Sequence, residues 1–196
     1  MAATALKYIS PKEYLEAEVL ADEKHEYFDG HIITMAGARE AHNSIVANLI
    51  GELHVFLKGK SCKVFPSDCR VSTPSSNSYM YPDVSIVCDE TEKRENEFDT
   101  VTNPSAIIEV LSDSTREKDQ GYKFFYYQQI PSLKEYILVD SISYFVQCIY
   151  RQPDDSWKFD TTKDINSSIM IRSVGLVLPL KDIYDRILFK KGAGTV

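Results

Sequence analysis

Long apolar runs are absent from this sequence. No stretch approaches the roughly 18 consecutive apolar residues of a membrane-spanning helix, so we expect no membrane span. The segment from Met1 to Lys7 also lacks the apolar region of a secretory signal peptide. The composition, with 43% hydrophobic and 26% charged residues, is that of an ordinary globular protein. We therefore expect a cytoplasmic protein with a single domain across residues 1–196.

Cysteine is scarce, and its spacing excludes several kinds of site. Cys62, Cys69, Cys88 and Cys148 include no Cys-x-x-Cys pair, which is the spacing of many zinc and redox sites. Cys88 and Cys148 lie in apolar segments with the character of strands. We expect buried, reduced thiols, as in most cytoplasmic proteins.

Several common catalytic signatures and an excess of positive charge are also missing. The sequence has no Gly-x-x-x-x-Gly-Lys-[Ser/Thr] loop, no Gly-x-Gly-x-x-Gly, no Gly-x-Ser-x-Gly and no His-x-x-x-His pair. The 22 Lys and Arg residues stand against 29 Asp and Glu, for a net charge of −7. Nucleic-acid-binding proteins are usually basic, so this balance counts against such a partner. It does not exclude a nuclease, which needs only a local basic path to its site.

Capping and turn signals divide the first part of the chain. Ser10-Pro11-Lys12-Glu13 is a capping box with proline at the first helical position, and it predicts the start of a helix. Asp29-Gly30 between His25–Phe28 and His31–Met35 predicts a β-hairpin. Within His42–Leu57, apolar residues recur every three or four positions, which predicts a helix that faces the core.

Strand and helix signals then follow in an order that predicts the fold. The strands at 81–87 and 106–111 are apolar on both faces, so helices should cover both sides of their sheet. We predict an α/β fold with a mixed central β-sheet, flanking helices and additional β-hairpins, and a core at about residues 42–140. The expected elements are strands at 62–71, 81–87, 106–111 and 135–139, a helix at 114–129, a hairpin at 144–159 and a helix at 182–187. Pro74–Ser78 is expected to form the loop between the first two strands, and Ser114-Thr115-Arg116-Glu117 is a capping box that predicts the start of the helix at 114–129.

Two carboxylates carry the most informative chemistry. Asp83 follows Pro82 at the start of one apolar strand, and Glu109 interrupts the next strand. A carboxylate is costly to bury without a partner, so Glu109 needs a cation, a hydrogen-bond network or a solvent-filled cleft. Two carboxylates at one end of adjacent strands suit a hard cation such as Mg²⁺. The alternative is that Asp83 caps a turn and Glu109 pairs with a buried Arg or Lys.

The order and spacing of six segments resemble a known family. They are Glu26–Ile32, the helix from His42, Tyr81–Val87, Ile108–Ser112, Asp119–Lys123 and Ile130–Tyr136. On these segments the chain is similar to the Uma-type family of restriction endonucleases, within the PD-(D/E)XK restriction-endonuclease-like superfamily. This resemblance implies a restriction-endonuclease-like core, a Mg²⁺ cofactor with Mn²⁺ as an alternative, and hydrolysis of DNA phosphodiester bonds. A homodimer is an analogy to restriction enzymes, which cut two strands with two sites.

The sequence departs from the superfamily pattern at one position. A lysine is expected two residues after the strand carboxylate Glu109, but Leu111 stands there. Lys123 on the following helix is our predicted substitute, with a surface pair to Asp119 as the alternative. Arg116 and Lys118 are the next candidates.

The resemblance also suggests further site residues. Glu26 is the predicted third carboxylate for catalysis and metal binding, with a solvated hairpin position as its alternative. Asp68 is another possible ligand, and His42 is either a phosphate-contacting or acid–base residue or a capping or core histidine. Two functions stay open at this point. The intact Asp83 and Glu109 favour an endonuclease, whereas Leu111 and the negative net charge favour a degenerate nucleic-acid- or protein-binding domain on the same fold.

Overall fold

The predicted α/β class with a mixed central sheet is confirmed. The computed structural model describes residues 8–35, 37–75, 77–94, 97, 99–112, 116 and 118–189. A six-stranded sheet has the order β11-β10-β9-β8-β6-β3, and only its β8–β9 pair is parallel. Its strands are β3 (Lys63–Pro66), β6 (Val84–Val87), β8 (Ala106–Leu111), β9 (Glu135–Asp140), β10 (Val146–Arg151) and β11 (Trp157–Thr162).

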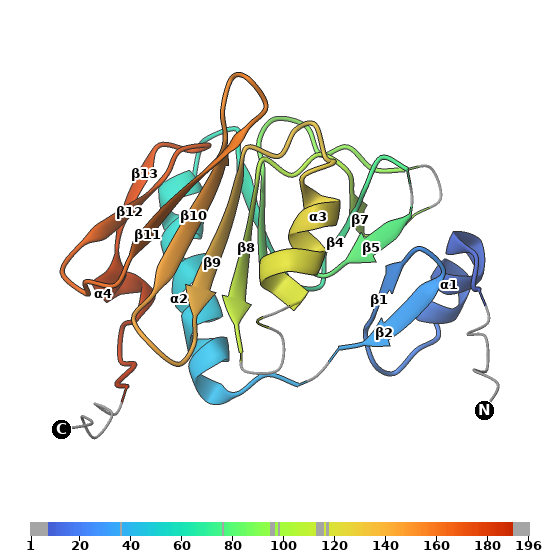
Figure 1. Cartoon of the computed structure of the whole chain (residues 1–196), viewed down its shortest axis with the longest axis horizontal. Helices are drawn as coiled ribbons and strands as arrows, with labels where there is room; N and C mark the ends of the chain where they lie inside the picture. Colours follow the sequence, from blue (N-terminus) through green and yellow to red (C-terminus); the bar gives the residue numbers. More distant parts are fainter. Residues whose placement is uncertain are drawn as a thin grey trace.

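Helices cover both faces of this sheet, as the apolar strands require. The long helix α2 (Glu40–Leu57) lies behind the sheet, and α3 (Phe124–Tyr127) lies in front of it (Figure 1). Side chains alternate along β8, so Ile108 and Val110 share a core with α2, whereas Ile107 and Leu111 share the other core with Tyr127 of α3. Glu109 therefore points to the same side as α3.

A smaller, five-stranded sheet carries the N-terminal elements. Helix α1 (Pro11–Glu18) has the predicted capping box, and the Asp29-Gly30 hairpin is confirmed, with positive φ at both turn residues. At Gly30 a Cβ would lie only 2.1 Å from the Tyr8 ring, so glycine is required there. The strand order is β2 (His31–Thr34), β1 (His25–Phe28), β5 (Ser78–Met80), β4 (Arg70–Ser72) and β7 (Thr100–Val101).

The single strand expected at 62–71 is wrong. The chain makes two strands there, β3 and β4, and they belong to different sheets. Pro66 has no backbone N–H to continue the ladder, and Cys69 N donates to Pro66 O at 3.1 Å to close a turn. The loop expected to reach Ser78 is also shorter than predicted, because β5 begins at that residue.

Only part of the helix expected at 114–129 is a regular α-helix. Its predicted capping residues Ser114, Thr115 and Glu117 lie outside the described residues. Lys118–Lys123 forms a π-helix, η1, that leads into α3. Gly121 lies within η1, and glycine is a poor α-helix former. Such single-turn π-helices occur often at functional sites.

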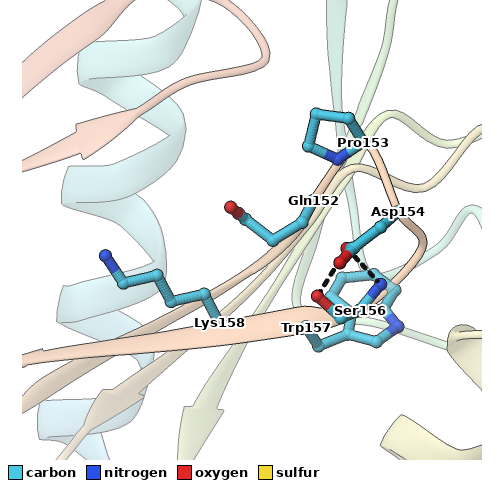
Figure 2. Close-up of a pocket in the computed structure, with 6 residues that line it drawn as sticks. All are labelled: Gln152, Pro153, Asp154, Ser156, Trp157 and Lys158. Carbon is cyan, nitrogen blue, oxygen red and sulfur yellow. Dashed lines mark hydrogen bonds between the residues drawn. The ribbon is translucent and has the colours of Figure 1, made fainter.

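The C-terminal elements follow the expected order with shifted bounds. The 144–159 hairpin is confirmed as β10 and β11, and Figure 2 shows its turn, where the Asp154 carboxylate accepts from Ser156 N and Oγ at 3.1 and 2.6 Å. Gln152, Trp157 and Lys158 line a shallow pocket beside this turn. The helix predicted at 182–187 instead spans Leu180–Ile183 as α4 and packs on α2. It follows β12 (Ser168–Ile171) and β13 (Leu176–Pro179), neither of which was predicted as a strand.

The expectation of four reduced cysteines is wrong. Cys62 and Cys88 form a disulfide at the adjoining ends of β3 and β6, because Lys63 and Val87 pair directly next to them. Cys148 is a buried free thiol, and Cys69 is partly exposed. The spacing of Cys62 and Cys88 gave no signal, since the pairing depends on strand register. Among the described helices, none has the length and apolar character to cross a membrane.

Candidate metal and catalytic centre

Asp83 and Glu109 meet on two inner strands of the central sheet, at the point where β6 begins. Strands β6 and β8 pair in antiparallel register with Val84 opposite Ile108, so Asp83 lies next to Glu109. Asp83 N donates to Glu109 Oε2 at 3.3 Å, and Val110 N donates to Asp83 Oδ2 at 2.7 Å. The expectation that these carboxylates lie on neighbouring strands and face one cleft is therefore confirmed.

Lys123 lies at the centre of this site. Its Nζ is 3.0 Å from Glu109 Oε1, 2.9 Å from Glu26 Oε1 and 3.3 Å from Asp119 Oδ1. The pair with Asp119 exists, but Lys123 is only 5% exposed, so the alternative of a surface pair is wrong. Leu111, at the position where the superfamily has lysine, is buried in the apolar core beside α3.

Glu26 reaches the same site from the smaller sheet. It is 1% exposed, so the alternative of a solvated hairpin residue is wrong. Glu26 Oε2 pairs with Lys118 Nζ, and Glu26 Oε1 accepts from Tyr81 N at 3.3 Å as well as contacting Lys123. Lys118 also lies 5.3 Å above the Phe28 ring. Strand β1 thus supplies a carboxylate that is held between two lysines of η1.

His42 contacts the site from the first turn of α2. Its Nε2 lies 3.2 Å from Asp83 Oδ2. Burial lowers the pKa of the His42 imidazole, but the hydrogen bond and charge of Asp83 outweigh burial and raise it. Two other candidates lie elsewhere. Asp68 is largely exposed and pairs with Lys24, and Arg116 donates to Asp140 Oδ1 at 2.7 Å.

These groups form the charged part of a cavity of about 560 Å³. Asp83, Glu109 and Lys123 line it together with the β2 segment that leads towards α2. Glu109 and Lys123 are nearly inaccessible, so a reacting group has to enter the cavity to reach them. Among the described residues, none lines both this cavity and the pocket of Figure 2.

Burial and neighbouring charges set the protonation of this cluster. Burial raises the pKa of the Glu109 carboxyl well above its usual range, with Lys123 opposing the shift and the nearby carboxylates adding to it. Burial also disfavours the charge on Glu26, but Lys123 and Lys118 outweigh it and lower the pKa of Glu26. Burial likewise disfavours the charge on Lys123, but three carboxylates outweigh it and raise its pKa. The surroundings therefore favour the charged form of Lys123, whereas burial favours the neutral form of Glu109.

Two buried residues of the site were not predicted as functional. Asp119 is 3% exposed and contacts Lys123, and the Tyr127 hydroxyl donates to Glu109 Oε1 at 3.1 Å. Asp119, Lys123 and Tyr127 follow one another at intervals of four residues. That spacing places polar groups on one helical face, and this face turns out to be the one that meets Glu109.

The donor set suits a small oxygen-binding cation more than a closed protein cage. Within the described parts of the chain, no group of three or more His, Cys, Asp or Glu residues is placed to hold a metal. Asp83 and Glu109 offer carboxylate oxygens beside an open cavity, and Mg²⁺ is commonly bound by one or two carboxylates plus water and substrate phosphate. The residues present therefore fit a two-carboxylate site. The assignment of Glu26 as a third ligand stays a prediction.

Comparison with known proteins shows the family to which the chain belongs. Residues 11–181 match the Uma2 family, whose description is "Putative restriction endonuclease". The chain belongs to this family. Two similar proteins of Synechocystis sp., both called uncharacterized, are 34% identical over 181 residues and 37% identical over 169 residues. These alignments cover 92% and 86% of this chain and 94% and 96% of the relatives.

A solved structure shows the same fold. It is titled as a "putative nuclease belonging to DUF820" from Anabaena variabilis, and its TM-score with this chain is 0.73 at 17% sequence identity. The match covers 89% of this chain and 97% of that chain. Membership of a family described as restriction endonucleases indicates a nuclease-like protein, and such a protein has a nucleic-acid substrate.

Proposed function

We propose that this protein is a Mg²⁺-dependent endonuclease that hydrolyses DNA phosphodiester bonds, with Mn²⁺ as a substitute cation. One observation carries the proposal: Lys123 Nζ lies 3.0 Å from Glu109, whose neighbour across the strand pair is Asp83. The two carboxylates supply metal ligands, and Lys123 supplies a positive charge for the scissile phosphate. In this proposal Lys123 takes the role of the lysine that the superfamily has at the position of Leu111, because η1 and α3 bring its side chain back to Glu109 on β8.

Asp83 and Glu109 are the proposed ligands. A bound divalent cation there would polarise the phosphoryl oxygen and lower the pKa of a bound water. The hydrogen bond of 2.7 Å from Val110 N fixes Asp83, and Tyr127 and Lys123 fix Glu109. These contacts hold both carboxylates in place before any ligand arrives, which reduces the reorganisation that the reaction requires.

The other polar side chains of the cavity have roles in stabilising the charge of the phosphate, in positioning Lys123 and in proton transfer. The Lys123 ammonium is placed to stabilise negative charge on the phosphate, and Glu26 and Asp119 hold it there. His42, in contact with Asp83, is placed to exchange a proton with a water in the cavity. The two lysine contacts of Glu26 favour a role in positioning Lys123 over direct metal binding.

Cleavage of supercoiled plasmid DNA tests the proposal. Wild type with Mg²⁺ or Mn²⁺ should nick the plasmid, and EDTA should stop the reaction. Asp83→Asn should lower the rate by at least about 100-fold, equivalent to about 2.7 kcal/mol of transition-state stabilisation. Asp182→Asn is the matched control, because Asp182 is an exposed aspartate of α4 that does not line the cavity, and it should keep the wild-type rate.

A binding protein on the same fold is the second candidate function. The net charge of −7 favours this second candidate, since proteins that bind long DNA are usually basic. Isothermal titration calorimetry with Mg²⁺ separates the two candidates. The nuclease proposal requires heat of binding that Asp83→Ala abolishes, whereas a degenerate site gives the same trace for both proteins.

The cytoplasm as compartment and a homodimer as assembly stay predictions. The disulfide between Cys62 and Cys88 removes the cysteine argument for a reducing compartment. Counting free thiols after rapid alkylation in cells tests the compartment, and analytical ultracentrifugation tests the dimer.

A further inference from the structure

We propose that the cavity holds one unpaired nucleotide, so that the substrate is single-stranded or locally unpaired nucleic acid in preference to a regular duplex. This inference rests on the proposed function and deepens it. Three features of the cavity carry it: the depth of the reactive groups, the apolar part of the lining, and the small number of cations.

The reactive groups lie at the bottom of a recess. Glu109 is 2% exposed and Lys123 is 5% exposed, and the β2 side of the cavity is made by residues such as Thr34 and Gly37. In a duplex, the nucleotides on either side of a phosphate are held in place by stacked and paired bases, and they would meet this wall before the phosphate reached the carboxylates. An unpaired nucleotide can rotate about its own backbone and enter alone, as bases do in enzymes that act on extruded nucleotides.

The cavity has the size and the surface for one such unit. Its volume of about 560 Å³ lies within the range of pockets that take small organic ligands. Ile33, Met35 and Val46 contribute apolar surface to the lining, and Ile33 keeps 37% of its surface exposed. A nucleobase placed against these side chains would bury apolar surface and so add to the binding free energy, which a charged phosphate would not do.

The cations around the cavity are too few to hold a long duplex. Lys24, Lys118 and Lys123 are the lysines that line it, and the described lining contains no arginine. Lys123 is buried among three carboxylates, whereas Lys24 and Lys118 each pair with one carboxylate and keep more of their side chains exposed, so they are the lysines that flanking phosphates can reach. Proteins that depend on duplex phosphates commonly make about 6–10 such contacts. About two contacts suit a short unpaired segment whose base supplies the remaining affinity.

Gly37 offers a precise test of the cavity. A Cβ at Gly37 would meet no atom within 4 Å, and the backbone there does not require glycine. The Gly37→Phe variant should therefore fold, with its new side chain occupying part of the cavity. Gly51 also has open space around its Cβ and lies on α2 outside the lining, so Gly51→Phe is the matched control. Ala38→Phe, at an exposed lining residue, is the second variant should Gly37→Phe melt early.

The experiment compares one labelled 20-nucleotide DNA strand, alone and annealed to its complement, with Mg²⁺ and with Mn²⁺. We expect the single strand to be cleaved at least about tenfold faster, because the duplex must first be unpaired. Gly37→Phe should lose at least about tenfold of this rate, and Gly51→Phe should keep it. Fluorescence anisotropy in EDTA gives binding of the same two probes, and log K for the single strand should fall with log[salt] at a slope of about −1.4 for two phosphates.

The outcomes separate this inference from the proposed function. If the duplex is cleaved as fast as the single strand or faster, the inference is overturned, but the proposed endonuclease activity is not. The same holds if Gly37→Phe and Ala38→Phe both cleave the single strand at the wild-type rate. Absence of any cleavage overturns the proposed function, and the anisotropy data then decide the inference. Tighter binding of the single strand that Gly37→Phe abolishes supports the inference, and equal binding or none overturns it.

Discussion

Removal of the Lys123 ammonium should destabilise the protein strongly even without substrate. Lys123→Met keeps the length of the side chain but leaves Glu26, Glu109 and Asp119 without the cation that contacts all three at 2.9–3.3 Å. Breaking a buried ion pair by deleting one partner costs about 3–5 kcal/mol. For a chain of this size, that free energy corresponds to a fall in Tm of about 6–20 °C.

The pH dependence of this loss follows from the shifted pKa values. The pKa of Glu26 is lowered, so its contribution to stability is present above the unfolded pKa and is lost as the pH falls through the folded pKa. The pKa of Lys123 is raised, so its contribution is present below the unfolded pKa and is lost as the pH rises through the folded pKa. The gap between wild type and variant should therefore be widest near neutral pH and narrow in acid.

Thermal melting by circular dichroism in EDTA, from pH 4 to pH 9, measures this gap. Lys12→Met is the matched control, because Lys12 is exposed on α1, and it should change the free energy of unfolding by less than about 0.5 kcal/mol. If Lys123→Met melts within 2 °C of wild type at pH 7, Lys123 does not lie among the three carboxylates and the reasoning about the site fails.

Three further changes test neighbouring parts of the structure. Glu109→Gln should hold or raise the Tm of the metal-free protein, and the difference in Tm from wild type should grow as the pH rises, because the raised pKa of Glu109 disfavours its ionisation in the folded state. Thermal melting from pH 5 to pH 8 tests this, and a clearly lower Tm of the variant at pH 8 contradicts it. Tyr127→Phe removes the donor at 3.1 Å from Glu109 and should cost about 1–2 kcal/mol in urea denaturation; no change would place the hydroxyl elsewhere. Reduction of the Cys62–Cys88 disulfide, which spans 26 residues, should cost about 3–4 kcal/mol, whereas Cys69→Ser should not alter the response to reductant.

The sequence was sufficient for the elements that local signals define. The capping box at Ser10, the turn at Asp29-Gly30 and the apolar period of α2 each specify a conformation within a few residues, and all three were predicted. The split of strand 62–71 depends on which sheet each half joins, which is a property of distant segments. Pro66 was the one local sign of that split, because proline interrupts a ladder.

The candidate site was predictable to the extent that residue type and strand order determine it. Asp83 and Glu109 followed from polar residues in apolar strands, and Lys123 followed from the resemblance once Leu111 took the usual lysine position. Asp119 was expected only as the surface partner of Lys123. Its burial depends on the π-helical turn of η1 and on the approach of β1, and neither has a period that a single sequence displays.

A crystal structure of the protein soaked in Mn²⁺ tests the central claim most directly. Anomalous scattering at the manganese edge locates the ion without any assumption about activity. We predict one strong peak within about 2.0–2.3 Å of carboxylate oxygens of both Asp83 and Glu109, at a distance typical of a hard cation with oxygen ligands. The same soak of Asp83→Asn should lose the peak. A peak at another position in the wild-type protein, or none at saturating Mn²⁺, would contradict a metal-dependent nuclease site at this cavity.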